Sequence, residues 1–203
     1  MSNHKLTRDD LYSLEKYAEI RDDFRSRIMA HKKKRRLNLG DSIVLLFEDR
    51  LIMQYQVQEM LKAEKIFEAD GIQEELDAYN PLIPDGTNWK ATMMIEYTEV
   101  SERQRMLSRL VGIENRVWVR VEGHDRVYPI ADEDLERATE DKTSAVHFLR
   151  FELDPPMIDA LHNGARLSAG VEHEHYSALV DPVPDSIRSS LLQDLESNAG
   201  QIQ

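Results

Sequence analysis

Two glutamates fall in a segment whose pattern is that of a buried helix, and a buried carboxylate is a group that can do chemistry. After Asp49, the apolar side chains up to Phe67 cover well over half of a helix circumference at about 100° per residue. Glu59, Glu64 and Gln56 fall inside that apolar arc. A carboxylate held there must pair with a cation, bind a metal or take up a proton.

Two interpretations of these glutamates remain open. In the first, they belong to a structural ion pair or hydrogen-bond network, with Arg50 or a more distant arginine as the cation. In the second, they line a functional polar pocket. The substitution Glu59→Gln separates a neutral hydrogen-bonding group, which would tolerate it, from a buried ion pair, which would lose stability.

Two histidines are in register with the apolar faces of predicted strands. In the strand Ser144–Leu153, His147 lies on the face of the large apolar residues, and His173 ends the apolar face of the strand Ala165–His173. His175 follows in an HxH spacing, which on one strand puts both rings on the same face. If Glu174-His175 is a turn, the two rings do not share a face. Each histidine is therefore either a hydrogen-bonded core residue or a ligand.

A metal site in this chain would need histidine and carboxylate ligands, because there is no cysteine. That ligand set suits non-haem iron, manganese or zinc. If the predicted helix and sheet meet, Glu59, Glu64, His147 and His173 would converge as such a site.

No fingerprint of a known enzyme class occurs in the sequence. The glutamates of the central helix are not followed by histidine at the third position, as they would be in a di-iron bundle. The motifs HExxH, GxSxG, GxxxxGK[ST] and GxGxxG do not occur either. The sequence therefore gives no support to hydrolase or nucleotide chemistry, and it indicates no substrate.

The composition and the N-terminal sequence argue against several classes of protein. The chain has 203 residues and a formal net charge of −12, which argues against general binding of nucleic acid. The N-terminus MSNHKLTRDD lacks the apolar core of a signal peptide, and the longest apolar runs are too short to span a bilayer. We expect a cytoplasmic protein that binds neither nucleic acid nor membrane, and the sequence leaves open whether it forms a homodimer.

The order of predicted elements indicates an α+β fold, with a mostly antiparallel or mixed sheet covered by helices, in a single domain over residues 1–203. Residues 1–40 are predicted as a helix followed by the basic run His31 to Arg36, either a solvated helix C-terminus or a site for anionic partners. The stretch Asp132 to Glu140 is predicted as a short exposed helix, and residues 181–203 as a partly ordered tail. The other predicted strands are Ser42–Phe47, Trp89–Tyr97, Val117–Val121, Arg126–Ile130 and Tyr176–Val180, and the other predicted helices are Gly71–Tyr79, Val100–Leu110 and Pro155–Asn163.

Several phrases together resemble one bacterial family, the domain of unknown function 3501. They are LLFEDRLIMQYQVQEMLKAEKIF, IQEELDAYNPLIPDGTNWKATMMIEY, SAVHFLRFEL and VEHEHY, which span nearly the whole chain. The residues at positions similar to the family's own phrases are Phe47-Glu48-Asp49-Arg50, Gln56, Glu59, Glu64, Glu75, Tyr79, Asn80-Pro81, Lys90-Ala91-Thr92, His147, Arg150-Phe151-Glu152 and His173. The family phrase His-Pro-x-Tyr reads His173-Glu174-His175-Tyr176 here, which weakens His175 as a shared site residue.

The resemblance implies an association with peroxide or redox metabolism, with rubrerythrin-like or iron–sulfur redox proteins as partners. The first hypothesis is an accessory or metal-binding factor in such a system. The second is an enzyme whose glutamates and histidines act as acid and base around a pocket with Arg50, Glu75, Tyr79 and Asn80. The third is a protein–protein interaction module.

Overall fold

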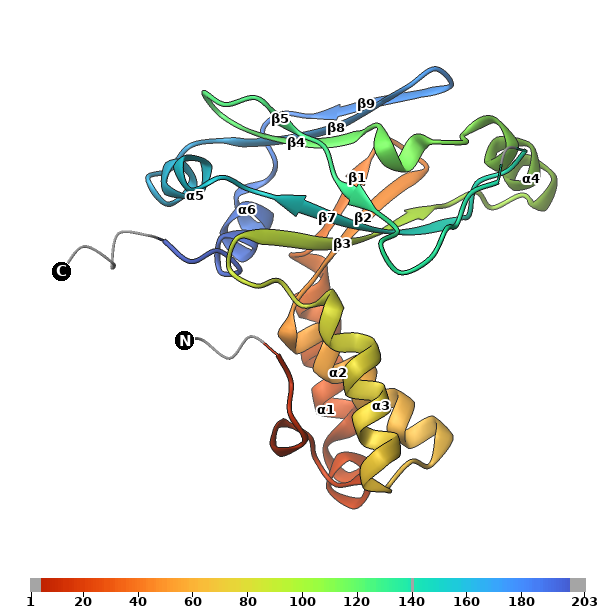
Figure 1. Cartoon of the computed structure of the whole chain (residues 1–203), viewed down its shortest axis with the longest axis vertical. Coiled ribbons are helices and arrows are strands. Elements are labelled where there is room, and N and C mark those ends of the chain that lie inside the picture. The colour runs from red at the N-terminus through yellow and green to blue at the C-terminus, as the bar shows by residue number, and fades with distance from the viewer. Residues whose placement is uncertain (1–4, 140, 198–203) are drawn as a thin grey trace.

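The computed structural model describes residues 5–139 and 141–197 and shows two sheets with a helical arm that projects from them (Figure 1). The first four residues, Glu140 and the last six residues lie outside the described part. All pairings between the strands are antiparallel, so the prediction of an α+β fold is confirmed. No helix in the described part is long and apolar enough to cross a membrane.

The larger sheet has five strands in the order β1-β2-β3-β7-β6. The smaller has four strands in the order β5-β4-β8-β9. The strands are β1 (Arg36–Leu39), β2 (Ile43–Glu48), β3 (Asn88–Ile95), β4 (Val117–Val121), β5 (Arg126–Val127), β6 (Ile130–Ala131), β7 (Val146–Glu152), β8 (Leu167–His173) and β9 (Tyr176–Val180).

The two sheets share one apolar core. Phe47, Trp89 and Phe151 from the larger sheet belong to the same buried cluster as Val119 and Val171 from the smaller. Three further helices accompany the sheets, α4 (Val100–Arg109), α5 (Pro155–His162) and α6 (Asp185–Leu192), with the short 3-10 turn η3 (Ile113–Asn115). The indole Nε1 of Trp89 donates to the carbonyl of Leu191 in α6 at 2.9 Å, so the C-terminal helix is part of the main core.

Strand alternation decides which residues of the larger sheet face away from this core. In β3, Trp89, Ala91 and Met93 are buried while Lys90 and Thr92 are half-buried on the opposite face. β7 has the same alternation, and His147 is fully buried on the inner face as its parity predicted. The outer face is the one from which the arm departs.

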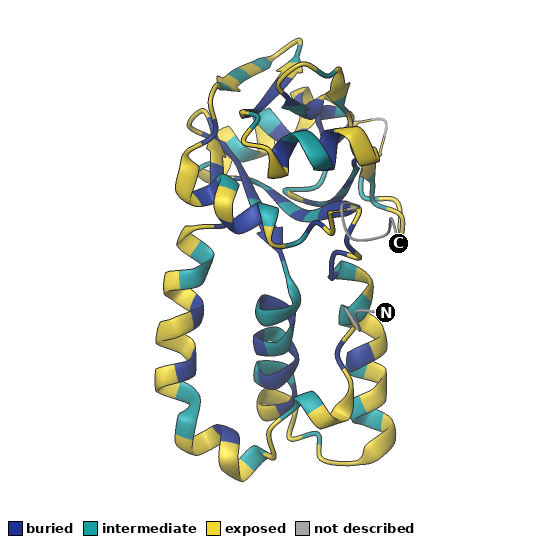
Figure 2. Cartoon of the chain, turned by 90° about the vertical axis from the view of Figure 1, so that its left-hand side faces the viewer, coloured by how far each residue is buried: buried dark blue, intermediate teal, exposed yellow. Residues whose placement is uncertain are grey.

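The arm is built from α1 (Leu14–Lys33), α2 (Arg50–Glu64) and α3 (Ala69–Tyr79), with the 3-10 turns η1 (Arg8–Asp10) and η2 (Asn80–Leu82). The chain leaves the sheet at the end of β2, and Asp49 caps α2 by accepting from the Ile52 amide at 2.9 Å. Small apolar clusters of its own hold the arm together, and α2 is its most buried helix (Figure 2).

The buried Arg35 joins the base of the arm to the sheets. Its side chain is 1 % exposed, and its guanidinium donates to the carbonyls of Phe47 at 2.9 Å and Ser190 at 3.2 Å. It also forms an ion pair with Asp194, which follows α6. A solvated helix end was one of the two alternatives for the basic run. That prediction is wrong for Arg35, because the chain turns into the unpredicted strand β1 and carries this side chain inside.

The charged stretch after β6 is not a helix. Residues 132–139 form a loop, and its polar side chains bond to one another and to β7 instead of to helical backbone groups. Asp132 takes a positive φ of 51°, where asparagine and aspartate are the commonest residues after glycine. The predicted helix is therefore wrong, and its last residue, Glu140, lies outside the described part.

Candidate functional site

A groove of about 760 Å³ lies where the arm meets the outer face of the larger sheet, and we call it the arm–sheet groove. Its floor comes from β2, β3 and β7, one wall from α3 and η2, and the rim from the loop after β6. The lining residues are Lys5, Glu48, Ala78, Tyr79, Asn80, Pro81, Leu82, Ile83, Asp85, Lys90, Ala91, Glu133, Asp134, Phe148, Leu149 and Arg150.

One row of charged residues crosses the floor of the groove. Glu48 in β2 is the register partner of Lys90 in β3, and Lys90 is the register partner of Arg150 in β7. Side chains directly opposite on one face of an antiparallel sheet have Cβ atoms about 4.5–5.5 Å apart. The sheet register therefore places the Cβ atoms of Glu48, Lys90 and Arg150 in one row.

Glu48 is the buried member of the row, at 5 % exposed. Its Oε1 accepts a hydrogen bond from the Thr92 hydroxyl at 2.6 Å, and its Oε2 has no partner among the described residues. Burial raises the pKa of Glu48, although the hydrogen bond from Thr92 opposes the shift. This side chain is thus biased toward the protonated acid, and its unpartnered oxygen is buried.

Lys90 is half-buried, and within the described part of the chain its ammonium has no hydrogen bond or ion pair. Burial, and after it the positive charge of Arg150, lowers the pKa of Lys90. Glu48 and Lys90 do not form an ion pair, although they are cross-strand neighbours. The floor therefore holds an acid and an amine that are each shifted toward their neutral forms.

Arg150, a predicted site residue, is held as a fixed cation. Its guanidinium donates to both carboxylate oxygens of Glu133 at 2.8 and 2.7 Å, and it also contacts Glu152. The hydrogen bonds to Glu133 raise the pKa of Arg150, and the same pair lowers that of Glu133. Arg150 therefore stays charged beside Lys90.

Tyr79 and Asn80, two further predicted residues, form the arm side of the groove. Burial, and after it the charge of Glu75, raises the pKa of the Tyr79 hydroxyl. The Asn80 side chain accepts from the Leu6 amide at 2.7 Å and donates to the Leu6 carbonyl at 3.0 Å. Asn80 thus fastens the N-terminal segment to the arm, while Glu75 lies on α3 outside the groove lining.

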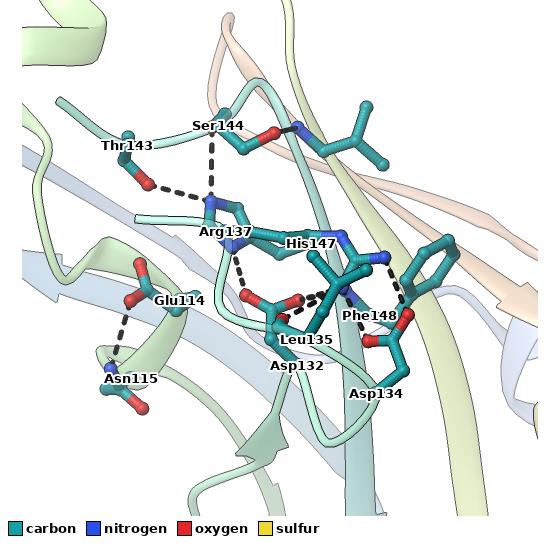
Figure 3. A network of polar contacts seen from close by, with 11 residues as sticks. Glu114, Asn115, Asp132, Asp134, Leu135, Arg137, Thr143, Ser144, His147 and Phe148 are labelled. Atoms are coloured by element: carbon teal, nitrogen blue, oxygen red, sulfur yellow. Dashed lines mark hydrogen bonds and ion pairs between the residues drawn. The ribbon is translucent and has the colours of Figure 1, made fainter. Parts of the chain in front are cut away.

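Figure 3 shows the polar network through which His147 holds the loop after β6, and that loop forms the rim of the groove. Its Nδ1 lies 2.6 Å from the Asp132 carboxylate, and its Nε2 lies 2.8 Å from the Thr143 hydroxyl and 3.1 Å from the Ser144 carbonyl. The Phe148 amide donates to the other oxygen of Asp132 at 2.9 Å.

The order carboxylate, imidazole, hydroxyl is that of a catalytic triad. Here, however, Thr143 is 1 % exposed and His147 is fully buried, so no substrate reaches the hydroxyl. The His147 network, made of Asp132, Thr143, Ser144 and His147, therefore positions the loop that carries Glu133 and Asp134.

The structure does not bring the four predicted metal ligands together. Glu59 lies in the arm, where both its oxygens accept from Arg21 at 2.8 and 2.7 Å and one accepts from the Tyr17 hydroxyl at 2.6 Å. Glu64 is exposed at the end of α2, and His173 Nε2 lies 3.1 Å from the Val111 carbonyl. Residues 5–139 and 141–197 contain no group of three or more histidines and acidic residues that would hold a metal.

The remaining predicted residues lie along α2, away from the groove lining. Arg50 pairs with Asp10 at 2.6 Å and not with either glutamate, and Gln56 is half-buried. Gln58 is fully buried, and its amide oxygen accepts from the Tyr12 amide at 2.6 Å.

We expect Glu59→Gln to lower the melting temperature by about 2–4 °C at pH 7. The hydrogen bonds from Arg21 lower the pKa of Glu59 from an ordinary 4.5 to about 2. A depressed folded-state pKa gives stability that is present above pH 4.5 and is lost as the pH falls through about 2. The difference between wild type and variant, measured by thermal melts from pH 7 down, should therefore shrink below pH 4.5.

The matched control is Glu64→Gln, which removes an exposed carboxylate from the same helix. It should leave the melting temperature unchanged. An equal loss in both variants would mean that the contacts with Arg21 and Tyr17 add nothing to stability.

A family described as "Protein of unknown function (DUF3501)" matches residues 5–195. The chain belongs to the DUF3501 family. The resemblance seen in the sequence is thereby confirmed, and no curated protein matches the chain.

A solved structure shows that this DUF3501 fold occurs elsewhere. It is the crystal structure, at 1.90 Å resolution, of a "novel protein of unknown function" from Burkholderia pseudomallei K96243. That protein is 53 % identical, the match covers 95 % of this chain and 100 % of the other, and the TM-score is 0.89.

Two groove residues that stand in the DUF3501 phrases are not among the site residues predicted from the sequence. Glu48 and Lys90 stand in the phrases Phe47-Glu48-Asp49-Arg50 and Lys90-Ala91-Thr92, which carried the resemblance. Strand parity was the available signal, because it places both side chains opposite their buried neighbours Phe47 and Trp89. The pairing of β2 with β3, which sets them side by side, is a long-range contact that the pattern of one strand does not specify.

Proposed function

We propose that the arm–sheet groove binds a small organic molecule and carries out acid–base chemistry on it. The observation that carries this is the pair Glu48 and Lys90, cross-strand neighbours on one groove floor with a raised and a lowered pKa. Titratable groups shifted in this way inside a cleft are typical of catalytic sites.

The two shifts complement each other chemically. A general acid or base works best when its pKa is near the working pH, and both shifts move these groups in that direction. Lys90 would accept a proton from a ligand in the groove, while Glu48, which is buried and bonded to Thr92, would be an uncharged polar group of the floor. Arg150, fixed by Glu133, would keep a positive charge beside the reacting groups.

The groove also has the size and the lining of a small-molecule site. Its volume of about 760 Å³ falls within the range of roughly 300–1,000 Å³ that is usual for such pockets. Leu82, Ile83 and Phe148 supply apolar walls, and the charged row supplies a few polar groups that would orient a ligand. The metal-dependent and redox roles, with rubrerythrin-like or iron–sulfur partners, rest on the family resemblance and stay predictions.

A ligand screen tests the proposal. We would measure thermal shifts and ligand-observed NMR with small carbonyl compounds, amines and hydroxy acids on the wild type and on Ala78→Trp. Ala78 is an exposed residue of α3 that lines the groove, so the indole should fill the groove without disturbing a core. Ligands that bind the wild type and not Ala78→Trp are the expected result. Equal binding to both proteins, or no ligand at all, would contradict the proposal.

We expect Lys90 to titrate below the other lysines, because burial and Arg150 both disfavour its charge. Reductive ¹³C-methylation followed by NMR titration reports each lysine, and Lys90→Arg assigns the signal. The exposed Lys62 on α2 serves as the internal control for an ordinary lysine. A Lys90 signal that titrates together with that of Lys62 would remove the physical basis of the proposed chemistry.

A further inference from the structure

We infer that two copies of this chain pair through strand β9, so that the smaller sheets of both copies join into one continuous sheet. β9 is an edge strand, because the order of that sheet is β5-β4-β8-β9. It lies on the opposite side of the sheets from the arm (Figure 1), and none of its residues lines the arm–sheet groove. The inference is therefore independent of the proposed function, and pairing leaves the groove open.

Among the sheet edges of residues 5–139 and 141–197, only β9 is both long and uncharged. Proteins keep edge strands from pairing by making them short, charging them or covering them. The edges β5 and β6 have two residues each. The edge β1 carries the charged Arg36, and its Leu39 carbonyl accepts from the Tyr176 hydroxyl of the smaller sheet at 2.6 Å. β9 has five residues, with no charge and no proline, so it lacks these protections.

The backbone groups of Ser177 and Leu179 in β9 point away from the sheet. Successive residues of an antiparallel strand direct their N–H and C=O groups to opposite neighbours. In β8, the Glu172 amide donates at 3.1 Å to the carbonyl that precedes β4, so the adjacent Val171 directs its groups to β9. The register partner of Val171 is Ala178, which is therefore bonded to β8. The residues on either side of Ala178 thus face the open edge, and no turn or loop of the described chain pairs with them.

β9 is complementary to itself in one antiparallel register, with the two-fold axis at Ala178. That register sets Ser177 of each copy opposite Leu179 of the other, and each such pair exchanges two N–H···O bonds. Every outward amide and carbonyl of these residues is then bonded. A shift of the register by two residues would set Leu179 opposite the turn residue His175 and lose this match. A two-fold contact of this kind is the commonest form of self-association.

The side chains fit the same register. Residues directly opposite each other share one face of a sheet, so the half-buried Tyr176 of one copy meets the half-buried Val180 of the other. On the outer face, Leu179 is 64 % exposed. It would lie diagonally across from Leu179 of the second copy, within reach of a long side chain. Pairing therefore covers an apolar side chain that one copy alone leaves exposed.

The charges beyond the ends of β9 support pairing with a second copy. The register continues with His175 opposite Asp181 of the second copy. Arg109 lies 3.3 Å from Nδ1 of His175 and brings a positive charge to that turn, while the acidic Glu174 is one position further from the pair. The carboxylate of Asp181 is 40 % exposed. Opposite charges therefore meet at both ends and offset part of the repulsion between copies with a net charge of −12 each.

Sedimentation equilibrium of the full chain tests the pairing. At about 0.15 M salt, repulsion between the copies is screened beyond about 8 Å. The weight-average mass of the wild type should rise with protein concentration toward twice the mass of one chain. Leu179→Pro removes one outward N–H and leaves the bonds from β9 to β8 in place, as proline does on the open side of an edge strand. This variant should stay monomeric at concentrations at which the wild type pairs.

The matched control is Leu179→Thr. It removes the same apolar side chain but keeps the backbone N–H, in a residue that favours strands. It should still pair, at most several-fold more weakly than the wild type. Complete loss of pairing in both variants would mean that the leucine side chain, and not the strand edge, joins the copies, which would contradict the inference.

Cross-linking tests the register without a change to the backbone. The chain has no cysteine, so Ala178→Cys carries a single thiol. At the two-fold axis the two Cα atoms would be about 4.5 Å apart, within the range of about 4.4–6.8 Å found in disulfides. In Val180→Cys the two substituted positions would be four residues apart along the paired strands, roughly 13 Å. Oxidation should therefore link Ala178→Cys into a covalent dimer and leave Val180→Cys unlinked.

Two results would overturn the inference. Equal cross-linking of both cysteine variants would show random collisions and not the register at Ala178. A wild type that stays monomeric at every concentration, together with an unlinked Ala178→Cys, would show that the copies do not pair. The open edge of β9 would then be left to a strand of another protein.

Discussion

Arg35→Met should lower the free energy of unfolding by about 3–5 kcal/mol, the cost of leaving buried charges without their partner. Arg35 is 1 % exposed and lies 3.4 Å from Asp49 in addition to its ion pair with Asp194. Its removal also leaves the carbonyls of Phe47 and Ser190 without a donor. Equilibrium unfolding in urea at pH 8 measures the loss.

The loss should depend on pH because of Asp194. Burial raises the pKa of Asp194 from an ordinary 3.8 to about 6, against the attraction of Arg35. A carboxyl with a raised pKa destabilises the fold as it ionises. The loss of unfolding free energy caused by Asp194 is therefore absent below pH 3.8 and grows as the pH rises through about 6. The deficit of Arg35→Met should therefore be larger at pH 8 than at pH 5, and adding Asp194→Asn should recover part of it.

The neighbouring arginine is the matched control. Arg36 pairs with Glu96 at 3.0 Å, but 43 % of its side chain is exposed. Such surface pairs contribute little, so Arg36→Met should cost less than about 1 kcal/mol. Equal losses for the two variants would show that Arg35 stabilises the protein no more than a surface charge does.

His147→Ala should cost about 2–4 kcal/mol, since it opens a cavity in the core and leaves the Asp132 carboxylate without its strongest donor. The effect should reach the groove, because Asp132 also accepts from the Phe148 amide and precedes Glu133 in the chain. Hydrogen exchange at the Phe148 amide and urea unfolding together measure the two consequences.

Two control variants test whether the effect of His147→Ala is specific to its place in the His147 network. Thr143→Val removes only the hydroxyl beside His147 Nε2 and should cost about 1 kcal/mol. His173→Ala removes a half-buried ring that contacts the Val111 carbonyl and accepts from the His175 amide, and it should leave exchange at Phe148 unchanged. The positioning role of the His147 network would be contradicted by fast exchange of the Phe148 amide in His173→Ala. Protection of that amide in His147→Ala would contradict it as well.

Strand parity predicted much of the sheet correctly. The alternation in Ser144–Leu153 placed His147 on the core side, and β7 has that register. The hairpin of β8 and β9 turns at Glu174-His175, as expected for one of the two alternatives for His175. These predictions succeeded because the period of two depends only on local backbone geometry and on which face is buried.

The glutamates of α2 show where a pattern is insufficient. The apolar arc was drawn as far as Phe67, but α2 ends at Glu64, and Phe67 is 74 % exposed. Glu64 has the angular position of the arc, between Met53 and Val57, but it is the last residue of α2 and is exposed. The partner of Glu59 is Arg21 in α1, 38 positions away, and only the packing of α1 on α2 brings it there.

The part of the arm made of α2, α3 and η2 is inserted between β2 and β3, which are neighbours in the sheet, while η1 and α1 precede β1. Glu48 ends β2 before the arm, and Lys90 follows its return in β3, in the same register row. The register of the sheet therefore fixes the acid and the amine whatever the length or sequence of the arm, while α3 and η2 shape the opposite wall. The floor of the groove and its opposite wall therefore come from different segments of the chain. Exchanging residues of α3 and η2 should change which ligand the groove binds and leave the residues of the floor in place.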